Sequence, residues 1–179
     1  MQIIMTGSTY IDFDKALNKG MKLIKSNENP SFGLLIVVGV NLGLRIDDLL
    51  KLSFDDLRQE KIEIIEGKTK KKRSLVINEH IQTALNYFDS DIKGRAFKSQ
   101  KGTVYSIQHV NRLIKKYFKG KVSSHSLRKS FGRRVWANDS ESERSLIYLS
   151  ELFNHSSSKV TRTYLGIRQA ELDNIYMNL

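Results

Sequence analysis

The fold of this chain centres on residues 30–45, which read PSFGLLIVVGVNLGLR. Pro30 is favoured in the first turn of a helix, where its missing N–H costs no hydrogen bond. The residues after it, through about Asn41, are apolar on nearly every side of a helix, and such a helix belongs in the middle of a core. Gly43 precedes a turn that carries Arg45, a charged residue among apolar neighbours. We therefore expect a central buried helix that presents Arg45 at its end.

The rest of the chain is mostly helical in pattern, with one short β segment. Residues 61–66 largely alternate between polar and apolar, which indicates a strand, and residues 73–77 are its expected partner across a loop at 67–72. The spacing of apolar and capping residues predicts further helices at 12–26, 47–52, 78–88, 106–120, 125–138, 141–153, from about 157, and at 168–179. The predicted fold class is mainly α with a small antiparallel β-hairpin sheet (α+β).

The length of 179 residues fits a single domain, with residues 1–10 as a lead-in and residues 168–179 as a C-terminal tail helix. The sequence contains no Cys, which excludes disulfides, thiol catalysis and Cys-ligated zinc. No stretch reaches the roughly 18 apolar residues that span a bilayer, and the N-terminus lacks a signal-peptide pattern. We expect a cytoplasmic protein without a membrane partner.

The net charge of +11 is concentrated in part of the chain. Residues 92–138 hold 13 basic and no acidic residues, and residues 68–73 add five basic ones. A merely solvated surface usually intersperses acidic residues for solubility, so this pattern favours a surface that follows nucleic-acid phosphates. The candidate DNA-binding residues are Lys70, Lys71, Lys72, Arg73, Arg112, Lys115, Lys116 and Lys129.

Arg45 needs a partner if it is buried, because an unpaired buried charge is costly. One alternative is a structural ion pair with Asp47 or Asp48, and another is a ligand anion. Both hold together if Asp48 orients Arg45 toward the ligand.

His125 and Arg128 are one helical turn apart, so their side chains share a face. His exchanges protons near neutral pH, and the planar fork of Arg can hold two phosphate oxygens. The pair, in a segment free of acidic residues, predicts a phosphate site. Taken alone, it is explained as simply by a surface His beside a surface Arg.

Three further side chains are candidates for chemistry. Lys68 begins the expected hairpin loop, from which it can deliver a proton to a leaving oxygen, although its basic neighbours suit plain attraction of DNA equally well. His155 lies nine positions before Tyr164. A Tyr hydroxyl, with an ordinary pKa of about 10, is a poor nucleophile unless cations and a base assist it.

Taken together, these candidates resemble the active-site set of the tyrosine recombinase (phage integrase) family, which carries Arg, Lys, His-x-x-Arg, His or Trp, and Tyr in this order. The resemblance extends from about Asp12 to Ile167, the whole catalytic domain of that family. Its motifs correspond here to GLRIDDLL (43–50), GKTKKKR (67–73) and HSLRKSF (125–131). The catalytic residues that it implies are Arg45, Lys68, His125, Arg128, His155 and Tyr164.

The resemblance implies a site-specific recombinase or integrase of a mobile genetic element, which acts in DNA recombination and integration. Tyr164 would attack a phosphodiester of double-stranded DNA, form a 3′-phosphotyrosyl link and release a 5′-hydroxyl. Arg45 and Arg128 would neutralise the nonbridging oxygens, Lys68 would be the general acid, His125 would exchange the tyrosine proton and His155 would hydrogen-bond the phosphate. The mechanism would need no metal and no cofactor. Several protomers would act together, and the tail at 168–179 either docks into a neighbour, as in the family, or packs on its own domain.

The sequence departs from the family pattern in places and leaves alternatives open. Asn154 stands where Gly is usual, Lys129 stands where a second His is common, and Lys70 and Lys71 are rivals of Lys68 as general acid. The family's N-terminal DNA-clamping domain is absent from this sequence, which is either an excised domain or a minimal chain. The alternative functions are a type IB topoisomerase-like relaxing enzyme and a non-catalytic basic DNA-binding module.

Overall fold

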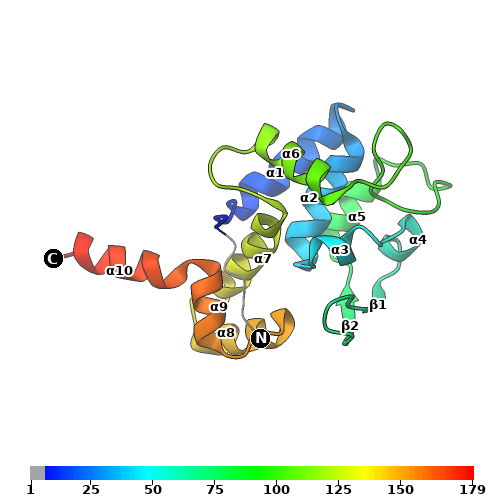
Figure 1. Ribbon diagram of the computed structural model, residues 1–179. Helices are drawn as coiled ribbons and strands as arrows, with labels where there is room; N and C mark the ends of the chain where they lie inside the picture. Colours follow the sequence, from blue (N-terminus) through cyan, green and yellow to red (C-terminus); the bar gives the residue numbers. More distant parts are fainter. Residues whose placement is uncertain (1–6) are drawn as a thin grey trace.

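The computed structural model describes residues 7–179, including all their side chains except those of residues 168–172. Figure 1 shows helices gathered around a central α2, with a small hairpin at one end and α10 projecting at the other. The elements in chain order are α1 (Phe13–Lys25), α2 (Pro30–Leu42), α3 (Ile46–Leu49), α4 (Phe54–Leu57), β1 (Lys61–Ile65), β2 (Lys72–Val76), α5 (Glu79–Leu85), α6 (Ile107–Tyr117), α7 (Ser124–Asn138), α8 (Glu143–Phe153), α9 (Ser158–Leu165) and α10 (Ile167–Met177). The predicted fold class, mainly α with an antiparallel hairpin, is confirmed.

Helix α2 is the buried centre that the sequence predicts. The Asn29 side chain caps its start by accepting from Phe32 N at 3.3 Å, and Pro30 occupies the first turn. The helix ends at Gly43, which has φ +59. A Cβ at this position would lie 2.3 Å from the Phe131 ring, so only Gly fits both the backbone and the space. This close turn sets the direction in which the chain leaves the core and therefore the position of Arg45.

The hairpin is antiparallel, with Lys61 opposite Val76 and Ile65 opposite Lys72. Its apolar side chains Ile62 and Leu75 face the core. The first strand ends one residue earlier than the alternation predicts, and the second both begins and ends one residue earlier, so that Glu66 lies outside β1 at the start of the connecting loop. Glu66 is buried all the same, which places a carboxylate at the inner end of the hairpin loop.

Helix α7 lies between two apolar clusters. On one side it packs against α1, α2 and α6, and on the other against α8 and α9. The smaller cluster, on the second side, is formed by Trp136, Leu146, Leu149, Phe153, Tyr164, Leu165 and Ile167. This placement brings the residues of α7 next to the end of α2, the end of α8 and the middle of α9.

Helix α4 was not predicted, because four residues are too few to show helical periodicity; it is held by a capping box between Ser53 and Asp56. The predicted tail helix is present as α10, which leads away from the body (Figure 1). Its last turn exposes Ile175, Tyr176 and Met177, and Leu179 after it is exposed as well.

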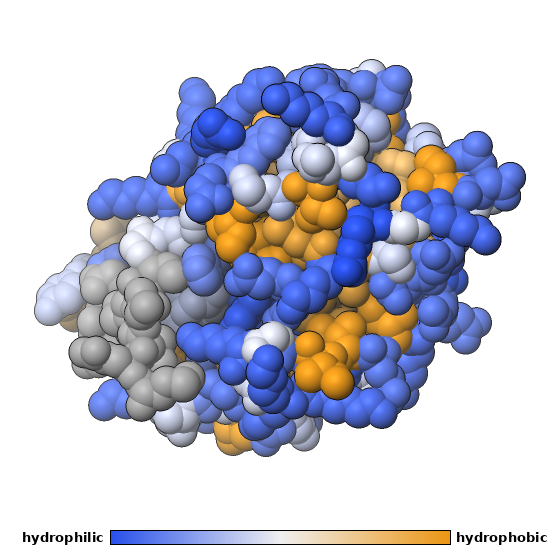
Figure 2. Space-filling model, turned by 45° about the vertical axis from the view of Figure 1, so that its right-hand side comes forward, coloured by the Kyte–Doolittle hydropathy of each residue, from blue (hydrophilic) through white to orange (hydrophobic). Residues whose placement is uncertain are grey.

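Figure 2 shows that hydrophilic residues cover most of one face of the molecule and leave two apolar areas visible between them. Within the described part of the chain, no helix is long and apolar enough to cross a membrane.

Candidate active site

Arg45 lies at the start of α3, half-buried, and is held from two sides. Its Nη1 donates to Glu66 Oε2 at 2.8 Å, and its Nη2 donates to the Phe153 carbonyl at 3.0 Å. The expectation that Asp47 or Asp48 pairs with Arg45 is wrong. Asp48 instead accepts from Lys51 Nζ at 3.0 Å and from Gly67 N at 2.9 Å, so it holds the start of the hairpin loop.

Glu66 is a site residue that the sequence analysis missed. Its carboxylate also accepts from Thr69 Oγ1 at 2.8 Å and from Arg73 Nη1 at 3.3 Å. Burial alone would raise the pKa of Glu66, but the Thr69 hydrogen bond and the charges of the surrounding arginines outweigh it and hold the pKa below its ordinary value. The available signal was a lone acidic residue at the inner end of a strand, next to a strongly basic loop.

Arg128 is buried beneath the site. Its Nη1 donates to the Gly43 carbonyl at 2.5 Å, and its guanidinium lies 4.2 Å from the centroid of the Phe153 ring. Burial lowers the pKa of Arg128 to about 10, so it keeps its charge at neutral pH. Among the residues that the structure describes, the other terminal nitrogen, Nη2, is buried without a hydrogen-bond partner. Because a buried unpaired donor on a charged group is costly, this atom marks a position suited to an anion.

His125 and Lys68 lie at the open side of the same site. His125 is on the first turn of α7 and is exposed, while Lys68 is exposed on the hairpin turn. Partial desolvation, and then the positive charges of Arg128, Lys129, Arg45 and Lys68, lower the pKa of His125 below its ordinary value. The imidazole is therefore mostly neutral at pH 7 and able to accept a proton.

His155 and Tyr164 pack against each other, with 5.1 Å between their ring centroids. His155 Nδ1 is 2.9 Å from Thr161 Oγ1. Burial, and then the charges of Arg128 and Arg45, lower the pKa of His155 to about 4, so it is neutral at pH 7. Tyr164 is buried on α9, and burial raises its pKa while Arg128 and Arg45 act in the opposite direction.

Asn154, the departure from the family's usual Gly, adopts the backbone that Gly would supply. It ends α8 with φ +54, a left-handed conformation that Asn tolerates better than most residues. The turn into His155 is therefore preserved, and His155 N donates to the Ser150 carbonyl at 2.8 Å.

The structure thus brings Arg45, Arg128, His125, His155 and Tyr164 into one electrostatically connected site, and the charge of Lys68, on the hairpin turn, also acts on His125. The profile of the phage integrase family matches residues 16–171. The chain belongs to the phage integrase family. This membership confirms the family resemblance and the predicted recombinase class.

Two relatives that are similar in sequence to this phage integrase family member carry recombinase names. Probable integrase/recombinase YoeC of Bacillus subtilis (strain 168) is 29% identical over 150 residues, which are 79% of this chain and 80% of the relative. Tyrosine recombinase XerC of Caldanaerobacter subterraneus subsp. tengcongensis is 26% identical over 172 residues, which are 87% of this chain but 48% of the relative. The chain therefore spans about half the length of that relative. Family and relatives support a site-specific recombinase or integrase function.

Two solved structures share the fold. XerA recombinase superposes with a TM-score of 0.67 at 20% identity, over 99% of this chain and 65% of the other. A lambda integrase dimer bound to a COC′ core site superposes with a TM-score of 0.64 at 16% identity, over 92% of this chain and 61% of the other. At these identities the likeness establishes the fold.

Two of the predicted DNA-binding residues, Arg73 and Lys129, are largely buried. Arg73 has a side chain only 10% exposed, because it pairs with Glu66 and donates to the Leu42 carbonyl at 3.2 Å. Lys129 is 7% exposed and lies beside Tyr164. The spacing of basic residues in the sequence does not distinguish such buried cations from exposed ones.

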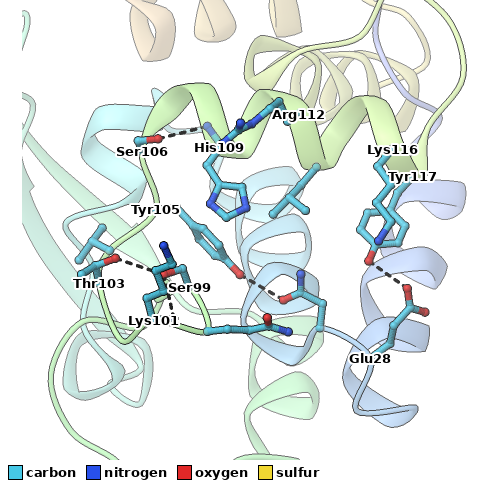
Figure 3. Close-up of a pocket in the computed structure, with 14 residues that line it drawn as sticks. Glu28, Ser99, Lys101, Thr103, Tyr105, Ser106, His109, Arg112, Lys116 and Tyr117 are labelled. Carbon is cyan, nitrogen blue, oxygen red and sulfur yellow. Dashed lines mark hydrogen bonds between the residues drawn. The ribbon is translucent and has the colours of Figure 1, made fainter.

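The other predicted DNA-binding residues are exposed, in two places. Lys70, Lys71 and Lys72 follow Lys68 around the hairpin turn. On α6, Lys115 is exposed, and Arg112 and Lys116 line a pocket of about 530 Å³ together with Lys101 and His109. Figure 3 shows the His109 and Tyr105 rings facing the space below α6. The catalytic candidates do not line this pocket.

Proposed function

We propose that this chain cleaves and rejoins double-stranded DNA at specific sites through a covalent 3′-phosphotyrosyl intermediate. The observation that carries the proposal is Arg128 Nη2, which is buried in the site that also holds Tyr164 and has no hydrogen-bond partner within the described part of the chain. A nonbridging phosphate oxygen would accept a hydrogen bond from this donor. The positive charge of Arg128 would stabilise the transition state strongly, because the site is buried and excludes water.

The remaining residues suit the steps of this reaction. Arg45, oriented by Glu66, is the second cation for the nonbridging oxygens. His125, neutral and exposed at the edge of the site, accepts the proton of the Tyr164 hydroxyl, and His155, also neutral, hydrogen-bonds the phosphate. Lys68 protonates the departing 5′-oxygen, with Lys70 and Lys71 as alternatives on the same turn. The exposed lysines of the hairpin and of α6 hold the flanking backbone.

The partners would be DNA and further protomers of the same chain. Among the solved structures that share the fold, XerH is a complex with its difH substrate, and lambda integrase is a dimer on its core site. The large apolar residues exposed at the end of α10 suit contact with a neighbouring protomer. We propose a cytoplasmic location, where a DNA element would be cut and rejoined.

The test uses a pool of nicked DNA duplexes whose arms have randomised sequences. After cleavage the short fragment with the 5′-hydroxyl dissociates, so rejoining is prevented and the covalent adduct accumulates. The wild-type chain should give a denaturation-resistant protein–DNA adduct whose captured members share a sequence. Tyr164→Phe should give none while binding DNA nearly as well. An adduct that persists in Tyr164→Phe, or none with wild type, contradicts the proposal. Relaxation of plasmids without any captured sequence would favour the topoisomerase-like alternative.

A further inference from the structure

Lys129 is a buried cation next to the attacking tyrosine. It follows His125 by one turn of α7, so the two side chains share a face of the helix. Its Nζ lies 4.9 Å from the centroid of the Tyr164 ring. At 7% exposure it cannot reach along a DNA backbone as the exposed lysines of α6 can. Its surroundings assign it to the site instead.

The Tyr164 ring is held by different groups on its different sides. His155 and Phe153 meet it in edge-on contacts, with centroids 5.1 and 5.7 Å away. Lys129 supplies a cation at the ring. A cation near an aromatic ring is attracted by its quadrupole, and it favours the phenolate over the neutral hydroxyl. Burial raises the pKa of Tyr164 and the charges of Arg128 and Arg45 act against it, so Lys129 would add to an effect that these two arginines already exert.

Lys129 also holds the segment that leads into α1. Its Nζ donates to the Ser8 carbonyl at 2.6 Å. The same segment is tied to α7 and to the loop before it, because Ile11 N donates to Ser130 Oγ at 3.1 Å and Thr9 N donates to the Lys121 carbonyl at 2.7 Å. The hydrogen bond to Ser8 therefore connects the lead-in directly to the ammonium that lies beside Tyr164.

We propose that Lys129 is a positioning residue for strand cleavage: its ammonium holds the Tyr164 ring and favours the phenolate, and its bond to Ser8 links the lead-in to the attacking group. This inference rests on the proposed role of Tyr164. It removes Lys129 from the DNA-contacting surface.

Substitutions separate the charge from the hydrogen bond. Lys129→Gln keeps a donor for the Ser8 carbonyl but has no charge, Lys129→Met loses both, and Lys129→Arg keeps both. Lys15→Met is the matched control, since Lys15 is an exposed lysine of α1 and loses the same charge. Each chain is checked for folding by its melting temperature. The measured quantities are the single-turnover rate of adduct formation at saturating protein and the dissociation constant for the same nicked duplex.

A tyrosinate titration adds a readout that a purely structural role would not change. The ultraviolet absorbance of each chain is recorded against pH, and that of its Tyr164→Phe version is subtracted. Loss of the ammonium should raise the midpoint of the Tyr164 difference curve, because the phenolate loses a nearby positive charge.

We expect Lys129→Gln and Lys129→Met to slow adduct formation about tenfold, which corresponds to one pKa unit on the nucleophile, with DNA affinity within about twofold of wild type. Lys129→Arg and Lys15→Met should stay near the wild-type rate. The inference is overturned if Lys129→Gln reacts at the wild-type rate, if its loss of rate is matched by an equal loss of affinity, or if Lys129→Arg is as slow as Lys129→Gln. In each of these cases the wild type still forms the adduct, whereas failure of the wild type overturns the proposed function itself.

Discussion

Arg45 Nη1 and Glu66 Oε2 lie 2.8 Å apart across 21 positions of sequence. This ion pair joins the turn after α2 to the start of the hairpin loop. The second anchor is the hydrogen bond from Gly67 N to Asp48 Oδ1, at 2.9 Å. Lys68 follows directly, so the loop that carries the proposed general acid starts from a fixed point beside the proposed phosphate site.

Glu66→Gln should impair both stability and cleavage. The substitution leaves the buried Arg73 and the half-buried Arg45 without their counter-charge, which should cost about 3 kcal/mol of unfolding free energy. Adduct formation should fall by at least tenfold, because Arg45 loses its orientation. Urea unfolding and single-turnover cleavage measure the two effects. Full activity of a folded Glu66→Gln chain would show that Arg45 needs no such support.

The Glu66 carboxylate should make the unfolding free energy depend on pH in the acidic range. The pKa of Glu66 is lower in the folded than in the unfolded chain, so its contribution is present above the unfolded value and is lost as pH falls through the folded one. Unfolding free energy should therefore decline in this acidic range less steeply in Glu66→Gln than in wild type. Parallel curves for the two chains would contradict the assignment.

His155 predicts a second loss of stability on acidification, in a higher pH range than that of Glu66. Its pKa is about 4 in the folded chain, against an ordinary value of 6.5, so the unfolded state binds the extra proton between these values. Stability should fall by about 2.5 kcal/mol as pH decreases from 6.5 to 4, and His155→Gln should remove that part of the slope. Chemical unfolding at a series of pH values is the measurement, with His80→Gln, an exposed His, as the control.

Arg128→Ala should impair the rate of cleavage, whereas Lys116→Ala should impair DNA affinity. Arg128 is buried beneath the site, and its loss should slow adduct formation by about 10²- to 10³-fold at saturating protein. Lys116 is exposed on α6, and its loss should weaken DNA binding and reduce the salt dependence of affinity while leaving the saturated rate nearly unchanged. Equal losses of rate in both variants would mean that Arg128 is only part of a basic surface.

Gly43→Ala should destabilise the chain by about 2–3 kcal/mol and slow cleavage as well. The added Cβ meets the Phe131 ring and requires a left-handed backbone that Ala disfavours. Arg45 and Arg128 both depend on this turn, the first through its direction and the second through the Gly43 carbonyl. Gly102→Ala is a suitable control, because Gly102 also has positive φ but nothing lies within 4 Å of its added Cβ.

The order and identity of the proposed catalytic residues could be predicted from sequence, and so could the central helix and the hairpin. Each of these depends on local patterns: the apolar run of α2, the alternation in residues 61–66, and the one-turn spacing of His125 and Arg128. Asn154 shows the limit of such patterns, because it stands where Gly is usual and yet adopts the left-handed backbone that Gly would supply.

The sequence alone determined that a buried helix ends at Gly43 beside an arginine and that the positive charge is gathered in two stretches, because these properties depend on neighbouring residues. Only the tertiary structure decided which charges face solvent and which face each other. Glu66 replaced Asp48 as the partner of Arg45, and Arg73 and Lys129 turned inward. Such partners are chosen by where the hairpin and α7 pack against the core, and contacts between residues far apart in the chain leave no local periodicity to read.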